Sequence, residues 1–265
     1  MKFFAAKLRV SALSLVVLFV VVVAAPCNLG AQTSDTIMLR GRRQTLHLYG
    51  RRGAGAPVIV SSGDGGWIHL GPYVAEFLSA RGFFVVGFDA KSYLESFTSG
   101  SNAVRAEDEP GDYSALANYA GQGSRERPIL IGVSEGAGLS VLAATDPQTQ
   151  RVIAGVIGLG LPDVNELGWR WKDAVIYVTH GVPKEPTFSA LAVIDKVSPL
   201  PLAAIHSTQD EFVPVATVEK IIAAAKEPKK LWIVPASDHR FSGNLQEFNQ
   251  ALLDAIAWVR QNQPR

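Results

Sequence analysis

Residues 128–144 read PILIGVSEGAGLSVLAA, and this stretch decides the fold. Its first part is a short apolar run typical of a buried strand, and its last part has the composition of a helix. Gly132 and Gly136 lack the Cβ atoms that would clash where strand and helix come close, so a tight turn can hold Ser134 strained and exposed. A serine between a strand and a helix in Gly-x-Ser-x-Gly is the context of a nucleophile elbow. We therefore predict that Ser134 is a nucleophile; the alternative is a plain tight turn.

The rest of the chain alternates strand and helix patterns. Two alternating runs at 36–39 and 45–49 predict an opening pair of strands. Later apolar runs predict buried strands at 58–62, 83–88, 129–133, 152–160, 201–206 and 230–234, with helices at 71–81, 113–119, 215–225 and 245–259. This order predicts an α/β fold with a mainly parallel central sheet and helices on both faces. The polar stretch 91–111 predicts a surface loop with some helix.

The regular alternation stops between residues 162 and 198, after the sixth predicted strand. We expect a small insertion or cap there, within one domain that spans residues 32–265. Trp169 and Trp171 alternate with Arg170 and Lys172 in this region. One face of an extended segment would then be aromatic and the other basic, which suits contact with a membrane surface. The alternative is a strand with one packed face.

The first 31 residues differ from the rest. Three basic residues, at positions 2, 7 and 9, precede an almost wholly apolar run from 11 to 25. This pattern predicts a signal peptide over residues 1–31 and a periplasmic or secreted protein, because the run is short for a spanning helix. Cys27 follows Ala-Ala-Pro and resembles a lipoprotein box, but the proline argues against lipid anchoring.

Charge and composition narrow the function classes. At 265 residues and 48% hydrophobic content, the chain is long enough for one sizeable core. Removing residues 1–31 takes away three basic and no acidic residues, so 25 Lys and Arg become 22 against 24 Asp and Glu. This near-balanced, slightly acidic charge does not favour nucleic-acid binding. The oligomeric state cannot be read from the sequence.

Candidate partners for Ser134 follow later in the chain. A serine hydroxyl needs an imidazole to accept its proton and a carboxylate to orient that imidazole. Asp210 lies in the loop after one predicted strand, and His239 lies in the loop after the next. The order serine, acid, histidine is that of the α/β-hydrolase fold. We predict Asp210 as the acid and His239 as the base, with Glu211 as the alternative acid.

A glycine-rich loop, Gly63-Asp64-Gly65-Gly66, follows the strand predicted at 58–62. An oxyanion hole needs two N–H groups, which we assign to Glu135 and to either Asp64 or Gly65. The alternative is a simple turn. The loop lacks the lysine and Ser/Thr of a phosphate-binding loop, and the chain lacks the residue spacing of a zinc site, so no cofactor or metal is predicted.

Other polar residues remain open in role. His47 and His206 lie in predicted strands and are expected to be structural, whereas His69 and His180 could reach the cleft. Four acidic residues follow strands or belong to the adjoining loops, namely Asp64, Asp89, Glu135 and Asp238. They predict an acidic cleft that would favour a cationic acyl group such as a lysyl ester. The alternative is that they point to solvent or cap helices.

Four segments together resemble the VirJ or AcvB family of bacterial virulence proteins. They are Ser-Gly-Asp-Gly-Gly-Trp at 62–67, the strand region 81–89, the Gly-x-Ser-x-Gly elbow and His239-x-Phe241. The resemblance runs over roughly 58–259 and implies a periplasmic α/β-hydrolase, some members of which cleave the lysyl ester of lysyl-phosphatidylglycerol. It also implies that Ser134 is the nucleophile, His239 the base and Asp210 the acid.

Two features depart from that family. Glu135 stands where the family usually has an aromatic or small residue, and segment 209–214 looks more like the acid loop of ordinary esterases and dienelactone hydrolases. The expected function is therefore an exported serine hydrolase that acts on a small-molecule or lipid ester. The alternatives are a generic small-ester carboxylesterase and a non-enzymatic periplasmic binding or secretion-assembly protein.

Overall fold

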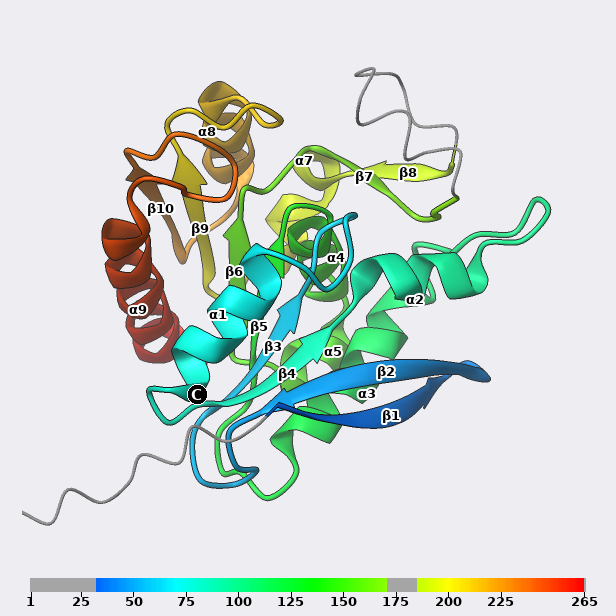
Figure 1. Cartoon of the computed structure of the whole chain (residues 1–265). Helices are drawn as coiled ribbons and strands as arrows, with labels where there is room; N and C mark the ends of the chain where they lie inside the picture. The colour runs from blue at the N-terminus through cyan, green and yellow to red at the C-terminus, as the bar shows by residue number, and fades with distance from the viewer. Residues whose placement is uncertain (1–31, 171–184, 265) are drawn as a thin grey trace, which may run out of the picture.

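The computed structural model describes residues 32–170 and 185–264 (Figure 1). Its main sheet has eight strands in the order β1-β2-β4-β3-β5-β6-β9-β10. Strands β4, β3, β5, β6, β9 and β10 run parallel, whereas β2 pairs antiparallel with both of its neighbours, β1 and β4. The bounds are β1 Thr33–Leu39, β2 Arg42–Tyr49, β3 Pro57–Ser61, β4 Phe84–Phe88, β5 Ile129–Val133, β6 Gly155–Leu159, β9 Leu202–Ser207 and β10 Lys229–Val234.

Helices cover both faces of this sheet, which confirms the predicted fold class. The helices are α1 Leu70–Ser79, α2 Ala90–Phe97, α3 Glu109–Gly121, α4 Glu135–Ala143, α5 Pro147–Val152, α7 Ala190–Val193, α8 Val215–Ala224 and α9 Leu245–Asn262. Helices α1 and α9 share one apolar cluster, and α2, α3, α4 and α8 share the other. The four strands β3 to β6 are buried along their whole length, which is why their sequences are apolar runs. None of the helices in the described residues is both long and apolar enough to cross a membrane.

The segment 91–111, predicted as a surface loop with some helix, has that form in the structure, with α2 and the start of α3 on either side of a loop at 98–108. Asp89 caps α2 by accepting a hydrogen bond from the N–H of Ser92, and Tyr93 and Leu94 are buried. Helix α3 begins at Glu109, which is itself fully buried. Apolar residues spaced as one helix face explain α2, although its intervening residues are polar.

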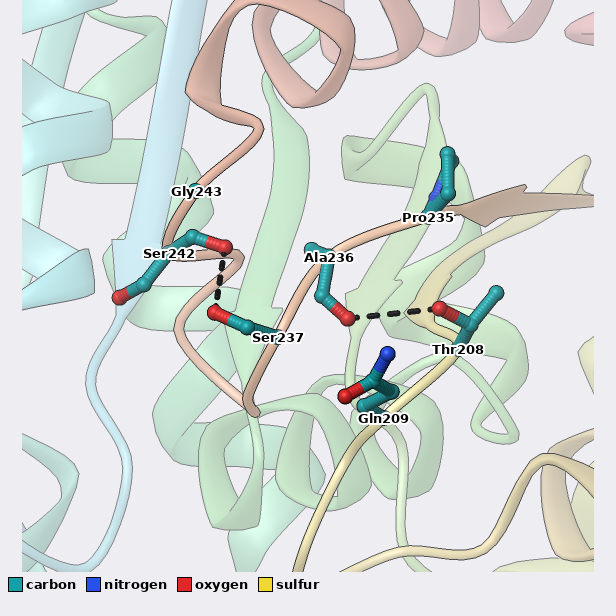
Figure 2. Close-up of a pocket in the computed structure, with 7 residues that line it drawn as sticks. All are labelled: Thr208, Gln209, Pro235, Ala236, Ser237, Ser242 and Gly243. Carbon is teal, nitrogen blue, oxygen red and sulfur yellow. Dashed lines mark hydrogen bonds between the residues drawn. The ribbon is translucent and has the colours of Figure 1, made fainter.

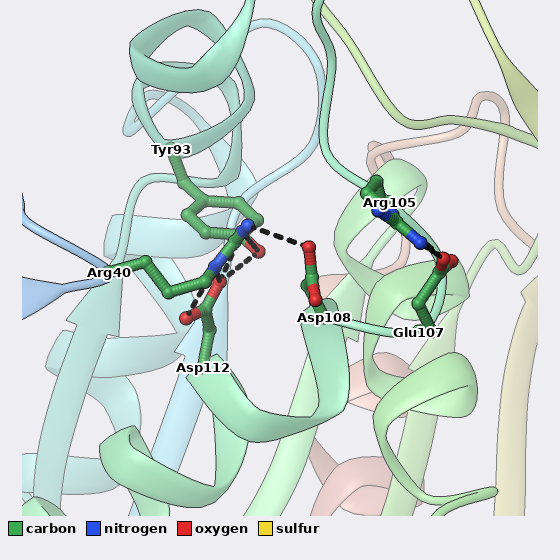
Figure 3. A network of polar contacts seen from close by, with 6 residues as sticks. All are labelled: Arg40, Tyr93, Arg105, Glu107, Asp108 and Asp112. Carbon is green, nitrogen blue, oxygen red and sulfur yellow. Dashed lines mark hydrogen bonds and ion pairs between the residues drawn. The ribbon is translucent and has the colours of Figure 1, made fainter.

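The hairpin β1–β2 is tied to α2 and α3 by one arginine. Arg40 has a φ of 45° and forms the tight turn with Gly41, so Arg42 and Arg43 belong to β2. Its guanidinium donates to Asp112 at 2.6 and 2.9 Å and reaches Tyr93 and Asp108 (Figure 3). Tyr93 also donates to Asp112 at 2.7 Å. This polar cluster joins three elements that the sequence keeps far apart.

The predicted insertion follows β6. It holds a two-stranded antiparallel sheet of β7 Val164–Glu166 and β8 Thr187–Ser189, followed by α7 and the 3-10 helix at Ile194–Val197. The Asn165 side chain packs so closely on α4 that a Cβ at Gly138 would lie 1.8 Å from its Oδ1. The predicted signal peptide, Cys27, Trp171 and His180 lie outside the described residues.

Candidate active site

Strand β5 and helix α4 meet at Ser134 in a turn that only glycine neighbours permit. Ser134 has φ 50° and ψ −116°, a strained conformation for a residue with a side chain. A Cβ at Gly132 would lie 2.1 Å from the carbonyl oxygen of Gly136, and one at Gly136 would lie 2.3 Å from that of Ser62. The N–H of Ser134 donates to the Leu159 carbonyl at 2.8 Å. The turn is therefore anchored to the end of β6.

Asp210 and His239 come from the loops after β9 and β10 and form a hydrogen bond. The distance from Asp210 Oδ2 to His239 Nδ1 is 2.6 Å, and the Asp210 side chain is 1% exposed. Burial alone would raise the pKa of Asp210. The hydrogen bond from His239 and those from the N–H groups of Phe212 and Val213 outweigh burial, so this pKa is lowered. Asp210 therefore stays ionised and can hold the imidazole of His239 through Nδ1. The other ring nitrogen, Nε2, is then not engaged by Asp210.

His239 is fixed from three further sides. Its main-chain N–H donates to Glu211 Oε2 at 2.7 Å, and its ring contacts the Phe212 ring edge-on at a centroid distance of 5.5 Å. A Cβ at Gly160 would lie 2.4 Å from the imidazole Cε1, so the ring rests directly on Gly160. Gly160 follows Leu159, which anchors Ser134. The structure thus brings Ser134 and His239 to the same strand end, and it uses Glu211 for main-chain support rather than for contact with the imidazole.

The glycine-rich loop lies beside Ser134. A Cβ at Gly63 would lie 3.4 Å from the Ser134 Cβ. The N–H of Gly66 donates to the Gly63 carbonyl at 3.0 Å, which closes a β-turn whose central residues are Asp64 and Gly65. The N–H groups of these central residues take no part in that turn bond. Glu135 is the first residue of α4, so its N–H has no partner within the helix.

Trp67 fixes the position of this loop from the other side. Its indole lies where a Cβ at Gly87 would be, at 2.3 Å, and it stacks on His47 at 4.9 Å. Its N–H donates to the Tyr49 hydroxyl at 3.3 Å. His47 is therefore structural, as expected. The role of Gly87 was not predicted, although a glycine inside a buried strand signals a close approach.

Three of the four residues behind the predicted acidic cleft are either hydrogen-bonded to main-chain N–H groups or buried. Asp89 caps α2, and Asp238 accepts the N–H groups of Arg240 and Ser242 in its own turn. Glu135 is buried at 7% exposure, and burial raises its pKa well above 4.5, with Glu166 and Asp64 adding to the effect. The alternative expectation, helix and turn capping, holds for Asp89 and Asp238, and Asp64 remains at the turn.

The ring of Trp169 is packed inside the protein. It is 4% exposed, and the Lys91 ammonium lies 4.1 Å from the centre of its ring. His206 is fully buried, and its Nε2 donates to the Val213 carbonyl at 2.9 Å, which makes it structural as expected. His69 starts α1 and is exposed, with a φ of 56°.

A pocket of about 220 Å³ lies against the loops that carry Asp210 and His239 (Figure 2). Hydrogen bonds from Thr208 to Ala236 and from Ser237 to Ser242 shape its walls. Its lining residues are Thr208, Gln209, Pro235, Ala236, Ser237, Ser242 and Gly243. The pocket does not include Ser134 or His239, so it is separate from the candidate active site. Within the described residues, no group of three or more His, Cys, Asp or Glu side chains could hold a metal ion.

Comparisons with known proteins agree with this architecture. The uncharacterized protein YfhR of Escherichia coli O157:H7 is 26% identical over 184 residues, which cover 69% of this chain and 63% of YfhR. The chain therefore spans less than two thirds of that relative's length. The α/β hydrolase GrgF from Penicillium sp. sh18 superposes with a TM-score of 0.65 at 15% identity, covering 88% of this chain and 99% of GrgF. The dienelactone hydrolase from Anabaena variabilis ATCC 29413 gives 0.61 at 16%, covering 88% and 98%.

These superpositions confirm the α/β-hydrolase fold. The family described as "Bacterial virulence protein (VirJ)" matches residues 56–258, from the start of β3 nearly to the end of α9. The match includes the elbow, the glycine-rich loop and both loops that carry Asp210 and His239. Since it covers most of the chain, this protein belongs to the VirJ family of bacterial virulence proteins.

Proposed function

We propose that this protein is a serine ester hydrolase in which Ser134 is the nucleophile, His239 the general base and Asp210 the orienting acid. The observation that carries the proposal is the Asp210–His239 hydrogen bond at 2.6 Å, with the imidazole resting on Gly160. The residue before Gly160 anchors the strained Ser134 turn. An oriented imidazole and a strained serine at one strand end are the parts that acyl transfer requires.

The proposed reaction is an acyl transfer in two halves. His239 Nε2 takes the proton of the Ser134 hydroxyl while the serine oxygen bonds to the ester carbonyl carbon. The N–H of Glu135 and that of Asp64 or Gly65 stabilise the resulting oxyanion. The bond to the leaving alcohol breaks, and His239 gives that alcohol its proton. Water repeats the sequence on the acyl-enzyme and restores Ser134.

For the substrate, we propose an aminoacyl ester of a phospholipid, such as lysyl-phosphatidylglycerol. Resemblance to VirJ-type proteins supports this choice. The burial of Glu135 favours the alternative, a small-ester carboxylesterase, because a buried carboxyl group is not accessible to a lysyl group. We also propose that residues 1–31 direct export to the periplasm, where such lipids would be met.

The test compares wild-type protein with S134A and with the matched control S140A. Ser140 is buried on the same helix and donates to the Gly136 carbonyl, so its loss removes a hydroxyl without touching His239. Labelling by a fluorophosphonate probe and hydrolysis of lysyl-phosphatidylglycerol, p-nitrophenyl acetate and p-nitrophenyl butyrate are measured. We expect S134A to lose labelling and roughly 10⁴-fold or more of kcat, and S140A to keep both.

The outcomes separate the candidates. Serine-dependent release of lysine that is faster than cleavage of the plain esters supports the lipid hydrolase. Serine-dependent cleavage of the plain esters alone supports the carboxylesterase. If the folded wild-type protein neither reacts with the probe nor cleaves any of the esters, the enzymatic proposal fails and the non-enzymatic binding or assembly protein is favoured.

A further inference from the structure

Phe212 is an exposed aromatic side chain that is held beside the proposed base. It is 52% exposed, and its ring meets the imidazole of His239 edge-on, with a centroid distance of 5.5 Å and an interplanar angle of 86°. An isolated exposed apolar side chain needs no explanation by itself. Phe212 differs because it contacts a residue assigned to the reaction. Its free ring surface therefore lies at the edge of the candidate active site.

The main chain at Phe212 is fixed by the same carboxylate that orients His239. Asp210 Oδ1 accepts the N–H groups of Phe212 at 3.0 Å and of Val213 at 2.8 Å, while Oδ2 bonds to His239. Val213 is 5% exposed, and its carbonyl accepts a hydrogen bond from the buried His206. Phe212 thus lies between two anchored residues, so its ring keeps a fixed place relative to the imidazole.

The two halves of an ester meet different parts of the site in the proposed reaction. His239 Nε2 gives its proton to the leaving oxygen, which must then lie about 2.6–3.2 Å from that nitrogen. The carbon atoms of the alcohol follow directly from this oxygen, on the imidazole side. The acyl carbon is bonded to Ser134, and its oxygen is directed to the turn at Asp64 and Gly65. Of the two halves, the alcohol is therefore the one within reach of Phe212.

We propose that Phe212 is a specificity-determining residue that contacts the leaving alcohol, and that the substrate is an ester whose alcohol part is apolar next to its oxygen. This inference rests on the proposed serine hydrolase and adds the side of the ester on which an apolar group is recognised. A hydrocarbon chain bound there covers the exposed part of the ring and removes apolar surface of both groups from water. A polar alcohol gains nothing from this contact.

Two isomeric esters test this inference, because they carry the same hydrocarbon on opposite sides of the ester group. Hexyl acetate has its long chain in the alcohol, whereas ethyl hexanoate has it in the acyl group. The measurement is kcat/KM on each isomer, with urea unfolding to check the fold. The proteins are wild type, F212A, F212L, S134A and the matched control M38A. Met38 is 59% exposed on β1, at the opposite edge of the sheet from β10, the strand that precedes His239.

We expect F212A to lose roughly tenfold in kcat/KM on hexyl acetate relative to ethyl hexanoate, because an apolar contact to one half of the substrate is removed. F212L keeps an apolar side chain and should recover part of this preference, and M38A should keep the wild-type ratio. The ratio separates contact with the substrate from support of His239. A displaced imidazole would slow both isomers by the same factor.

An unchanged ratio in F212A, or an equal loss on both isomers, overturns the inference. If F212A does not fold, F212L must show the same shift in smaller measure, and an unchanged ratio there overturns it too. In each case, wild-type cleavage that disappears in S134A retains the serine hydrolase. If the folded wild type cleaves neither isomer, the inference also fails, and fluorophosphonate labelling decides the other proposal. A labelled Ser134 would keep the serine hydrolase, and absence of labelling would reject both.

Discussion

Replacement of Gly160 by alanine should disable the proposed base while leaving the fold in place. The imidazole of His239 rests on this glycine, and an added Cβ would lie 2.4 Å from Cε1 and 2.9 Å from Nδ1. Carbon atoms in contact are normally separated by about 3.5–4.0 Å, so the ring must move by roughly 1 Å. The nitrogen that the methyl group approaches is the one bonded to Asp210. The displacement therefore acts on the hydrogen bond that orients the ring.

The G160A substitution should lower both the catalytic rate and the free energy of unfolding. A displacement of about 1 Å in a catalytic group can reduce the rate by roughly 10²-fold, and we expect a loss of this order in kcat/KM. The backbone at Gly160 has a φ of 61°, and an alanine there costs about 1–2 kcal/mol of stability. A weakened Asp210–His239 hydrogen bond adds about 1.5–3 kcal/mol. The variant should then unfold at lower urea concentration and yet remain folded in buffer.

The assay is hydrolysis of p-nitrophenyl acetate together with urea unfolding. The matched control is G82A, because Gly82 has a φ of 87° and a Cβ there would meet nothing within 4 Å. G82A should share the backbone cost and keep the full rate. A G160A protein that is folded and as active as the wild type would refute the assignment of His239 as the base.

Three further predictions follow from the same contacts. In G132A the new Cβ would lie 2.1 Å from the Gly136 carbonyl oxygen, so we expect a loss of about 1–3 kcal/mol or more by urea unfolding and a loss of fluorophosphonate labelling. In D112N the Arg40 guanidinium loses its buried carboxylate partner and keeps only Asp108, and since Arg40 is 32% exposed we expect a loss of about 1.5–3 kcal/mol of unfolding free energy, reduced by high salt. Burial raises the pKa of Glu109 well above 4.5, so its contribution to stability is fully present below pH 4.5 and is lost as the pH rises towards the raised pKa. E109Q should therefore flatten the decrease of unfolding free energy between pH 5 and pH 8, and an unchanged slope would contradict this.

Local sequence patterns predicted most of the sheet, and long-range contacts explain what they missed. Strands β3 to β6 are buried on both faces, so their sequences are continuous apolar runs with little ambiguity. Helix α2 was predicted only as some helix within a surface loop, without bounds, because its buried Tyr93 and Leu94 stand among polar residues, although Asp89 is a recognisable N-cap. The Arg40–Asp112 contact joins the opening hairpin to α3. A charge pair at such sequence separation leaves no periodic signal.

In the candidate site, too, the local features could be predicted and the long-range contacts could not. The elbow could be predicted because its strand, serine, two glycines and helix are contiguous in the sequence. The role of Gly160 could not be predicted in this way. A side chain at this position would collide with His239, which belongs to a loop much later in the chain. In the sequence, the Gly-Leu-Gly at 158–160 is too short to indicate a dinucleotide site, and its actual contact becomes visible only when β6 and the loop after β10 are adjacent.

The acidic side chains explain why substrate charge is harder to predict than the catalytic residues. A carboxylate after a strand can point into a cleft, but it can also satisfy the free N–H groups of the helix or turn that follows. Asp89 and Asp238 do the latter, and a sequence pattern does not distinguish the two uses. Glu135 takes a third course, since a residue at the start of a helix under an insertion is buried, and burial raises its pKa. The sequence therefore does not determine the charge that a substrate meets, which is why the comparison of lysyl and neutral esters decides the substrate class.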